Sequence, residues 1–542
     1  MANTKKKVAS RGKTMDIRPP KSFKKKSEED FNPKVKVEEK EKVTVKKEMK
    51  KKEDKKSNLR TVSKVFAIIA TIINSIFAFR LFSTSILPAK YAYPVLAGLA
   101  LVTLFYIYKA FRNKTHKTVL IILDVLAVIL SAAFLFATVK INQVFGFLDS
   151  TFNKGTQTAI YNIVVNKDAS YSKPEDLKDK KLLSYEELIK DISNEDLEKK
   201  LKDTIPGTSL EFKDDIDVVM NSILKDKTAA ILVNAGTYGS YVDNNPTYEG
   251  KVKVIGTIEA TYKEEAATEA AKKDITNTPF VLFINGIDTR TNKMPSRSLS
   301  DVNIVAAINP NTKKIVMVTT PRDYYVQLHG TTGLRDKLTH AGTKGGVKLS
   351  QATLEDLYDV KIDRYIRVNF NFVKKLVDAI GGISVYNDVN YAIHTSDVAN
   401  SNDKCTIQPG WNEVNGKCAL GFARERKQYK DGDRHRGRNQ MHVIEQIIKK
   451  VTSASTLLSK YSDIMKSLEG TFDTSISTED ITSLVRMQLD DMASWEVEQY
   501  SVNGKGQLTK TYSYPNQNLY VMLPDKNTVN TAKEKIKKVL SE

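Results

Sequence analysis

The sequence contains few of the residues that form the commonest catalytic and metal sites. It has two cysteines and six histidines in 542 residues, and no paired histidines lie near the cysteines, which disfavours a zinc site. The serine-nucleophile motif G-x-S-x-G, the zinc-protease motif H-E-x-x-H and the Walker loop are absent. These absences argue against acyl transfer and zinc-dependent hydrolysis.

The net charge of +20 is concentrated near the N-terminus. Residues 1–60 hold 22 Lys and Arg against 10 Asp and Glu, and residues 61–149 hold 8 against 2. The remaining residues, 150–542, are almost neutral, with 54 against 52. Residues 1–60 are rich in Lys and Glu and poor in aromatics, so we predict a disordered basic tail. This tail could contact anionic lipid or nucleic acid, but a solvated retention signal at the inner leaflet is favoured, and no nucleic-acid partner is expected.

Three apolar segments follow, at 65–82, 91–108 and 118–138. Each is near the roughly 20 residues that cross a bilayer, so residues 61–140 are predicted to form three transmembrane helices. Basic residues flank the side that carries the tail, which predicts a multi-pass protein of the cell membrane with a cytoplasmic N-terminus and an extracellular C-terminal part. Asp124 interrupts the third segment; a structural contact with another helix is favoured over a proton relay.

The outer part divides into two predicted domains. Residues 141–275 alternate short strands with amphipathic stretches, which indicates an accessory α/β domain without a catalytic constellation. Residues 276–542 contain strands and helices whose simplest packing is an α/β/α sandwich with a mixed central sheet. One hairpin, "DVNIVAAINPNTKKIVMVTTPRD" at 301–323, has a predicted turn at 309–313 and carries charges at both ends. Because antiparallel strands return their ends together, Asp301 and Arg322 are predicted to leave this hairpin at the same edge.

The two cysteines, Cys405 and Cys418, fall in this outer region. Outside the membrane they can oxidise, so a disulfide that holds a strand against the following helix is favoured over two free thiols. Between them, Asn415-Gly416 is typical of a hairpin turn.

Arginine is unusually dense in "GFARERKQYKDGDRHRGRNQ" at 421–440. Arg436 and Gln440, four residues apart, are predicted to share one face of a helix that continues through "MHVIEQIIKKV". A basic surface patch is one interpretation. The other is a diphosphate site, because guanidinium groups bind phosphate oxygens in pairs and stay charged. Asp288 and Asp301, each near a strand end, could then share Mg²⁺ with the diphosphate, or they could cap loop amides. The apolar faces of the helix near 370–380 and of the sheet read first as core, and second as a slot for a lipid.

The stretch from about 279 to 455 resembles the LytR-CpsA-Psr family of cell-wall glycopolymer transferases. The matching motifs are, in order, "GID" at 286–288, "SD" at 300–301, "PRD" at 321–323, "DKLTHAG" at 336–342, "VNF" with "LVDAIGGISV", "NGKCALGFARER" and "DRHRGRNQ". Three apolar segments and an extra domain before these motifs resemble the capsule-associated branch of streptococci and their relatives, which implies a Gram-positive source.

The resemblance implies an enzyme that moves a glycopolymer, such as capsular polysaccharide or teichoic acid, from an undecaprenyl-diphosphate carrier to peptidoglycan as a phosphodiester. It implies that Asp288 and Asp301 hold Mg²⁺ or Mn²⁺, and that either Asp433 or one of the metal-held Asp residues assists deprotonation of the attacking hydroxyl. The implied diphosphate ligands are Arg322, Arg424, Arg426, Arg436 and Gln440, supported by Lys337. The family often has an Arg two residues before the "SD" Asp. This chain has Leu299 there, with Arg297 displaced by two, so Arg297 is a further candidate ligand of the diphosphate.

Two other classes of function stay open at this stage. A non-catalytic, membrane-anchored binder or sensor of lipid-linked sugars would keep the arginines without needing the carboxylates. A membrane-bound regulator of capsule or wall genes would need a DNA-reading fold in the cytosol, where the sequence offers only the tail and a short loop.

Overall fold

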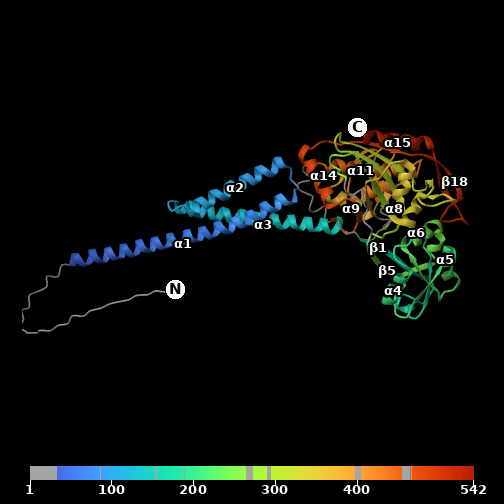
Figure 1. The fold of residues 1–542 in the computed structure, drawn as a ribbon, viewed down its shortest axis with the longest axis horizontal. Helices are drawn as coiled ribbons and strands as arrows, with labels where there is room; N and C mark the ends of the chain where they lie inside the picture. The colour runs from blue at the N-terminus through green and yellow to red at the C-terminus, as the bar shows by residue number, and fades with distance from the viewer. Residues whose placement is uncertain are drawn as a thin grey trace, which may run out of the picture. The chain divides into compact units, whose positions relative to one another are not determined.

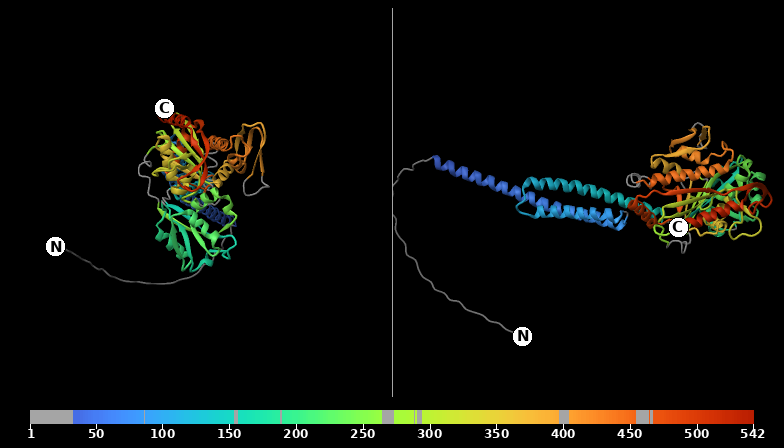
Figure 2. Two further views of the ribbon diagram at one scale, coloured as in Figure 1. Left: turned by 90° about the vertical axis from the view of Figure 1, so that its right-hand side faces the viewer. Right: turned by 90° about the horizontal axis from the view of Figure 1, so that it is seen from above.

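The computed structural model of the chain describes residues 33–85, 87–152, 156–187, 189–263, 273–287, 289, 294–396, 404–453, 464 and 467–542. The colours of Figures 1 and 2 follow the chain from the blue N-terminal helices to the red C-terminal helix. Residues 1–32 of the predicted tail and residues 264–272, between the two outer domains, lie outside the described residues. The second outer domain, residues 276–542, holds the motifs of the family resemblance and is called the catalytic domain.

Among the described residues, three helices are long and apolar enough to cross a membrane, as predicted. They are Ser57–Thr84 within α1 (Pro33–Thr84), α2 (Ala89–Phe111), and Lys117–Gly146 within α3 (Lys117–Phe152). Their orientation stays a prediction. Helix α3 continues to Phe152, so the accessory sheet begins later than residue 141.

Helix α1 differs from the prediction at its start. It begins at Pro33, so the expectation of disorder is wrong for residues 33–60. Lys and Glu are good helix formers, and a helix that is already nucleated in the adjoining apolar segment extends at little cost. Composition alone therefore underestimated the helical length.

Asp124 on α3 lies among polar groups of two other helices. Its carboxylate accepts hydrogen bonds from Ser63 Oγ of α1 at 2.6 Å and from Tyr106 OH of α2 at 2.7 Å. A buried carboxylate without donors would be costly in an apolar environment. Asp124 thus makes the structural contact with other helices that the sequence analysis favoured over a proton relay.

The accessory domain is a five-stranded mixed sheet with helices, as the alternating pattern predicted. The sheet order is β3-β2-β4-β1-β5; β2 runs parallel to β3 and β4, and β1 runs antiparallel to β4 and β5. The strands are β1 (Thr156–Asn166), β2 (Lys181–Tyr185), β3 (Ser209–Lys213), β4 (Ala230–Asn234) and β5 (Val252–Lys263). The helices are η1 (Pro174–Leu177), α4 (Asn194–Thr204), α5 (Ile216–Lys225), α6 (Ala235–Asn244) and α7 (Pro246–Glu249).

The catalytic domain is built on a six-stranded mixed sheet with the order β16-β11-β6-β7-β8-β17. The pairs β6–β11 and β8–β17 are parallel, and the other neighbours are antiparallel. The strands are β6 (Phe280–Ile287), β7 (Ser300–Asn309), β8 (Lys314–Thr320), β11 (Arg364–Val368), β16 (Phe472–Thr474) and β17 (Glu496–Ser501). The C-terminal segment thus supplies both edge strands and completes this sheet.

Helices cover both faces of the sheet, which confirms the α/β/α sandwich. Alternate residues of β7 point to opposite faces. Val305 and Ala307 pack against α8 (Leu338–Tyr358) and α15 (Lys526–Ser541), whereas Ile304 and Ala306 pack against Met441 of α11 (Asp433–Val451). Helix α9 (Phe370–Ala379) lies with α10 (Gly416–Arg424) and α11 in a second core cluster.

The remaining elements form small ribbons and one further helix. Strand β12 pairs with β15 and β13 with β14, outside the main sheet. Their bounds, with those of the other short elements, are β9 (Tyr325–Val326), β10 (Asp336–Lys337), β12 (Ile383–Asn387), β13 (Ile393–Ser396), β14 (Lys404–Ile407), β15 (Gly410–Val414), α14 (Thr478–Asp491), β18 (Gly504–Lys510) and β19 (Asn518–Pro524).

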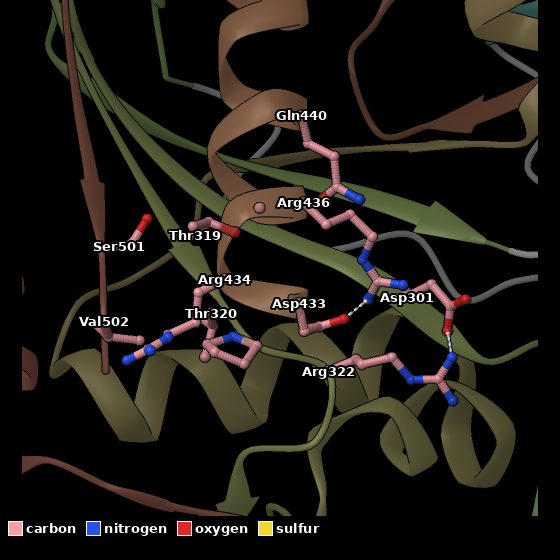
Figure 3. Close-up of a pocket in the computed structure, with 12 residues that line it drawn as sticks. Asp301, Thr319, Thr320, Arg322, Asp433, Arg434, Arg436, Gln440, Ser501 and Val502 are labelled. Atoms are coloured by element: carbon pink, nitrogen blue, oxygen red, sulfur yellow. Dashed lines mark ion pairs between the residues drawn. The ribbon is translucent and has the colours of Figure 1, made fainter. Parts of the chain in front are cut away.

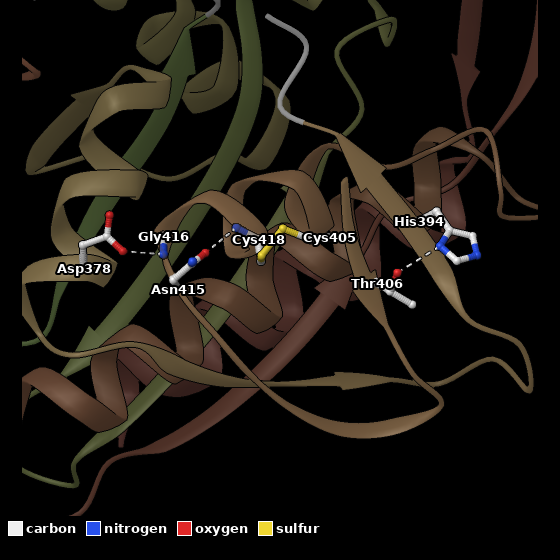
Figure 4. Close-up of a disulfide and its surroundings, with 7 residues drawn as sticks. All are labelled: Asp378, His394, Cys405, Thr406, Asn415, Gly416 and Cys418. Carbon is white, nitrogen blue, oxygen red and sulfur yellow. Dashed lines mark hydrogen bonds between the residues drawn. A yellow bond between two sulfur atoms is a disulfide. The ribbon is translucent and has the colours of Figure 1, made fainter. Parts of the chain in front are cut away.

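The predicted disulfide is present: Cys405 of β14 is bonded to Cys418 of α10 (Figure 4). The expectation of a hairpin turn at Asn415-Gly416 is wrong. Asn415 caps α10 instead, and its side chain accepts a hydrogen bond from Cys418 N at 3.0 Å. Asn is favoured both in hairpin turns and at the N-cap of helices, and here Asn415 is the N-cap of the helix that follows.

The accessory and catalytic domains are joined by a buried cluster of charges around Arg297. Arg297 Nε lies 3.1 Å from Asp191 Oδ1, and Nη1 lies 3.4 Å from Glu187 Oε2; the Arg297 side chain is 2% exposed. Burial raises the pKa of Glu187, while Arg297 opposes that shift. A buried guanidinium between two carboxylates therefore holds the two domains together.

Breaking the disulfide is expected to loosen the β14–α10 region. Closing a loop of this size is worth about 3 kcal/mol against the unfolded chain. In a C405S/C418S variant, amide hydrogen exchange in β14 and the first turn of α10 should accelerate on the order of tenfold or more. Reduced wild type should behave like the variant. Unchanged exchange in both would show that the bridge does not stabilise this region.

Replacing Arg297 with Met leaves Glu187 and Asp191 as buried carboxylates without their cation. We expect the free energy of unfolding to fall by about 3–5 kcal/mol at neutral pH. The loss should shrink as the pH falls, because protonated carboxyl groups need no cation. Thermal unfolding across pH measures this. The control is Lys227→Met, which breaks an exposed ion pair with Asp168 and should leave the free energy of unfolding almost unchanged. Equal losses in both variants would contradict the interpretation.

Candidate functional site

The charged ends of the predicted hairpin meet at one edge of the sheet. Strands β7 and β8 pair from Asn309–Lys314, beside the turn, to Asn303–Thr320. Antiparallel strands return their ends together, so Asp301 and Arg322 leave the hairpin as neighbours. Arg322 Nη1 lies 2.8 Å from Asp301 Oδ1 (Figure 3). The two ends therefore lie at the same edge, as predicted, and in addition they form an ion pair.

Arg322 has a second carboxylate partner, which comes from the accessory domain. Its Nη2 lies 2.6 Å from Asp243 Oδ2 on α6. The Arg322 side chain is only 10% exposed. Burial by itself would lower the pKa of Arg322, but the neighbouring carboxylates, Asp301 and Asp243 first among them, raise it above the ordinary value. The guanidinium is thus a permanent cation.

Helix α11 brings two further side chains to the same edge. Arg436 and Gln440, four residues apart, share one face of this helix, as predicted, and both line the pocket beside Asp301 and Arg322. Gly437 allows the helix to approach the sheet closely, because a Cβ at that position would lie 3.2 Å from Thr319 Cγ2. A larger residue would push Arg436 and Gln440 away from the strand ends.

Asp433 lies in the first turn of α11, where the positive end of the helix dipole stabilises a carboxylate. Its Oδ1 lies 2.6 Å from Nη2 of Arg436 (Figure 3). The neighbouring Arg434 donates a hydrogen bond to Asn503 Oδ1 at 2.7 Å and lines the same small hollow as Asp433. Asp433 is therefore beside the pocket and held by one of its arginines.

Arg424, at the end of α10, is positioned by an aromatic ring. Its guanidinium carbon lies 4.0 Å from the centre of the Phe370 ring at the start of α9. This stacking orients the planar group at the pocket wall, where Arg426 also lies.

These side chains surround one open pocket of about 420 Å³. Within the described part of the chain, its lining holds five cationic side chains against three carboxylates. The charged and amide side chains that line it are Asp243, Asp301, Arg322, Arg424, Glu425, Arg426, Lys427, Arg436 and Gln440. The excess of positive charge suits a ligand with more than one negative charge.

A second cavity, of about 240 Å³, shares a wall with the first and is almost wholly apolar. It lies between the sheet and helices α9, α10 and α11, in the region that the sequence predicted first as core. Aliphatic side chains line it, including Ile284, Ile366, Val373, Leu376, Ile444 and Ile447. Val302, Phe370, Arg424 and Gln440 line both cavities. The second interpretation of these apolar faces, a slot for a lipid, thus fits this part of the fold.

Two predicted ligands are placed away from the pocket lining. Lys337 is buried, and its Nζ lies 3.2 Å from Asp323 Oδ1, so it anchors the loop that carries Arg322. Arg297 belongs to the charge cluster between the domains, because the local chain turns its side chain toward Glu187 and Asp191. Asp323 in turn anchors the loop, as its pairing with Lys337 indicates.

Of the two predicted metal ligands, only Asp301 belongs to the described residues. Asp301 lines the pocket, whereas Asp288 lies outside the described residues. In the parts of the chain that the structure describes, no group of three or more His, Cys, Asp or Glu is arranged to hold a metal ion. The chemistry of one carboxylate beside an arginine-lined pocket is compatible with Mg²⁺, which commonly takes one or two carboxylates together with phosphate oxygens and water.

The sequence did not predict Asp243, Glu425 or Lys427 as pocket residues. Glu425 and Lys427 adjoin predicted arginines, but Asp243 is distant from all of them in sequence. It precedes Arg322 by 79 residues and belongs to another domain, in a stretch with no recognisable motif. No local signal could have identified it, because only the docking of α6 brings it to the pocket.

Comparisons with known proteins agree with the fold and the motifs. The model of the LytR_cpsA_psr family matches residues 249–538. The biofilm regulatory protein A of Streptococcus mutans is 30% identical over 267 residues, which are 48% of this chain and 65% of that protein, so the chain spans just under two thirds of that relative. The polyisoprenyl-teichoic acid–peptidoglycan teichoic acid transferase TagU of Enterococcus faecalis is 30% identical over 48% of this chain and 82% of its own length.

Among solved structures, TagV of Bacillus subtilis has 28% sequence identity and a TM-score of 0.41, over 49% of this chain and 98% of that one. The family model covers more than half of the chain, from the end of the accessory domain to the last helix. The protein therefore belongs to the LytR_cpsA_psr family.

Proposed function

We propose that this protein transfers a glycopolymer from an undecaprenyl-diphosphate carrier to peptidoglycan and forms a phosphodiester bond. The observation that carries the proposal is that the two cavities lie side by side and share a wall. An apolar cavity next to an arginine-rich pocket matches a ligand with a hydrocarbon tail and a diphosphate head. The names of the relatives support the same reaction class: the E. faecalis protein is named as a transferase of polyisoprenyl-linked teichoic acid to peptidoglycan.

The arginines would bind the diphosphate and neutralise its charge as the reaction proceeds. Guanidinium groups form paired hydrogen bonds with phosphate oxygens, and four of them line the pocket: Arg322, Arg424, Arg426 and Arg436. Phosphoryl transfer needs little covalent chemistry from the protein, so charge neutralisation and positioning supply most of the rate enhancement. Gln440 adds a neutral donor on the same helix face as Arg436.

The proposed reaction is a displacement at phosphorus. The 6-hydroxyl oxygen of an N-acetylmuramic acid residue attacks the phosphorus atom that carries the glycopolymer. The bond from that phosphorus to the bridging oxygen breaks, and undecaprenyl phosphate leaves with that oxygen. Asp433, at the pocket edge beside Arg436, accepts the proton of the hydroxyl.

Asp301, with Asp288, would hold Mg²⁺ or Mn²⁺ against the diphosphate. Such a cation would neutralise the phosphate oxygens when bound. Asp301 is suited to this place because it is 14% exposed, lies at a strand end and faces the same pocket as the arginines. A rigid strand keeps its carboxylate in one position.

Attachment to a membrane fits the proposed donor. The three apolar helices would keep the catalytic domain near a polyprenyl carrier, which is itself confined to the bilayer. Tethering raises the effective concentration of the enzyme for such a substrate. The proposed location is the outer face of the cell membrane, where peptidoglycan is the acceptor.

Replacing Asp301 with Asn should lower the rate of transfer about 10²–10³-fold, because the carboxylate charge that would hold the cation and pair with Arg322 is lost. The assay measures release of lipid phosphate from a lipid-diphosphate sugar with peptidoglycan and Mg²⁺. Asp356→Asn is the matched control, since this carboxylate is 57% exposed and pairs only with His329 among its described ion pairs. Equal rates for wild type and Asp301→Asn would instead favour a binding or sensing protein.

Replacing Ile447 with Trp should fill part of the apolar cavity that Ile447 lines. The expected result is a KM about tenfold higher for a donor with a full-length polyprenyl chain, because lost apolar burial of this size is worth about 1–2 kcal/mol. A donor with a short prenyl chain serves as the internal control and should be affected much less. A similar loss with both donors would mean that the lipid does not enter this cavity.

A further inference from the structure

The accessory domain contributes a charged side chain to the catalytic pocket. Asp243 stands near the end of α6 and lies 2.6 Å from Nη2 of Arg322, whose Nη1 faces Asp301 at 2.8 Å. Asp243 is 40% exposed, and it lines the same pocket as Asp301, Arg436 and Gln440. A single guanidinium therefore bridges two carboxylates that come from different domains.

Helix α6 is held on the catalytic domain by contacts next to Asp243. Asn244 Nδ2 lies 3.2 Å from Nε2 of His340, and the Asn244 carbonyl accepts a hydrogen bond from Gln517 Nε2 at 3.3 Å. His340 is itself buried and fixed by Asp336, whose Oδ1 lies 2.6 Å from His340 Nδ1.

One turn earlier on α6, Ser240 Oγ lies 3.0 Å from Tyr514 OH, and both groups are buried. At the start of the helix, Gly236 packs against the backbone of Arg297, where a Cβ would lie 2.9 Å from the Arg297 carbonyl carbon. The helix is thus fixed along its length, and the position of Asp243 follows from this docking.

Asp243 also lies outside the part of the chain that the family model covers. That match begins at residue 249 and includes every other charged pocket residue described above. Asp243 is therefore a pocket residue that the family match does not include.

We infer that Asp243 is a positioning residue for Arg322: it holds Nη2 and so keeps the guanidinium turned toward the diphosphate. This inference rests on the proposed function. A guanidinium with one carboxylate partner tends to form a closed, bidentate pair with both of its oxygens. With Asp243 absent, Arg322 would turn onto Asp301, and both groups would be withdrawn from the ligand.

The direction of this effect separates positioning from competition. If Asp243 only competed with phosphate for Arg322, its removal would strengthen anion binding. If it positions Arg322, its removal weakens binding, because the guanidinium must be turned back from Asp301 before it can contact the ligand. Asn at the same position keeps one oxygen that can accept from Nη2 without the negative charge.

The test measures binding of inorganic pyrophosphate with Mg²⁺ to the full chain in detergent by calorimetry. Asp243→Ala should weaken binding on the order of tenfold, the effect of one hydrogen bond to a charged group. Asp243→Asn should stay within about threefold of wild type, as rescue of the hydrogen bond predicts. Asn244→Ala is the matched control: it removes a contact between the domains one residue away and leaves Arg322 untouched, so its affinity should equal that of wild type.

Each other outcome overturns the inference. Tighter binding by Asp243→Ala would identify a competitor, and equal affinity would show no role. A loss in Asn244→Ala as large as in Asp243→Ala would show that only domain docking matters. If wild type itself fails to bind pyrophosphate, the pocket is not a diphosphate site and the proposed function fails with it; a wild type that binds, with an unaffected Asp243→Ala, overturns this inference alone.

Discussion

The site depends on the ion pair between Asp301 and Arg322 at the open end of the β7–β8 hairpin. Both strands are buried through their middle, with one face against α8 and α15 and the other against α11. Burial on both faces fixes the strands and therefore their ends, so two opposite charges are held at one edge without freedom to separate. Asp243 is held directly by this pair, through Arg322.

The two faces of the sheet are packed to different degrees. Toward α8 and α15, large side chains such as Phe283, Tyr324 and Tyr358 are fully buried in a continuous core. Toward α9, α10 and α11, aliphatic side chains line an apolar cavity that shares a wall with the arginine-rich pocket. Apolar residues thus form a closed core on one face of the sheet and a cavity lining on the other, where Gly286 contributes no side chain.

Charge is also the means by which the accessory domain is attached. Arg297 lies between Glu187 and Asp191 in a buried cluster, and Arg322 meets Asp243 at the pocket. In both places an arginine of the catalytic domain is paired with carboxylates of the accessory domain. Buried pairs of this kind add less to stability than to specificity of docking, since each charge requires its partner in one geometry. The accessory domain therefore has a defined orientation toward the site.

The sequence by itself determined the sandwich, the three apolar helices, the disulfide and the meeting of Asp301 with Arg322. Each follows from local rules: periodicity, segment length, and the return of antiparallel strands. The pairing of Arg436 with Gln440 on one helix face is of the same kind. Local rules gave a wrong prediction at Asn415-Gly416, because Asn is favoured both in a hairpin turn and at the start of a helix. They were also wrong for residues 33–60, into which the helix of the first apolar segment extends.

Only the tertiary structure decided which arginines face the pocket and whether apolar residues form core or cavity. Arg297 and Arg322 are the same residue type, and the sequence did not distinguish their surroundings. Arg297 is buried between the domains, whereas Arg322 lines the pocket. Asp243 enters the pocket solely because α6 docks on α8. Packing between segments distant in sequence has no local code, because its free energy is a property of surfaces that exist only after folding.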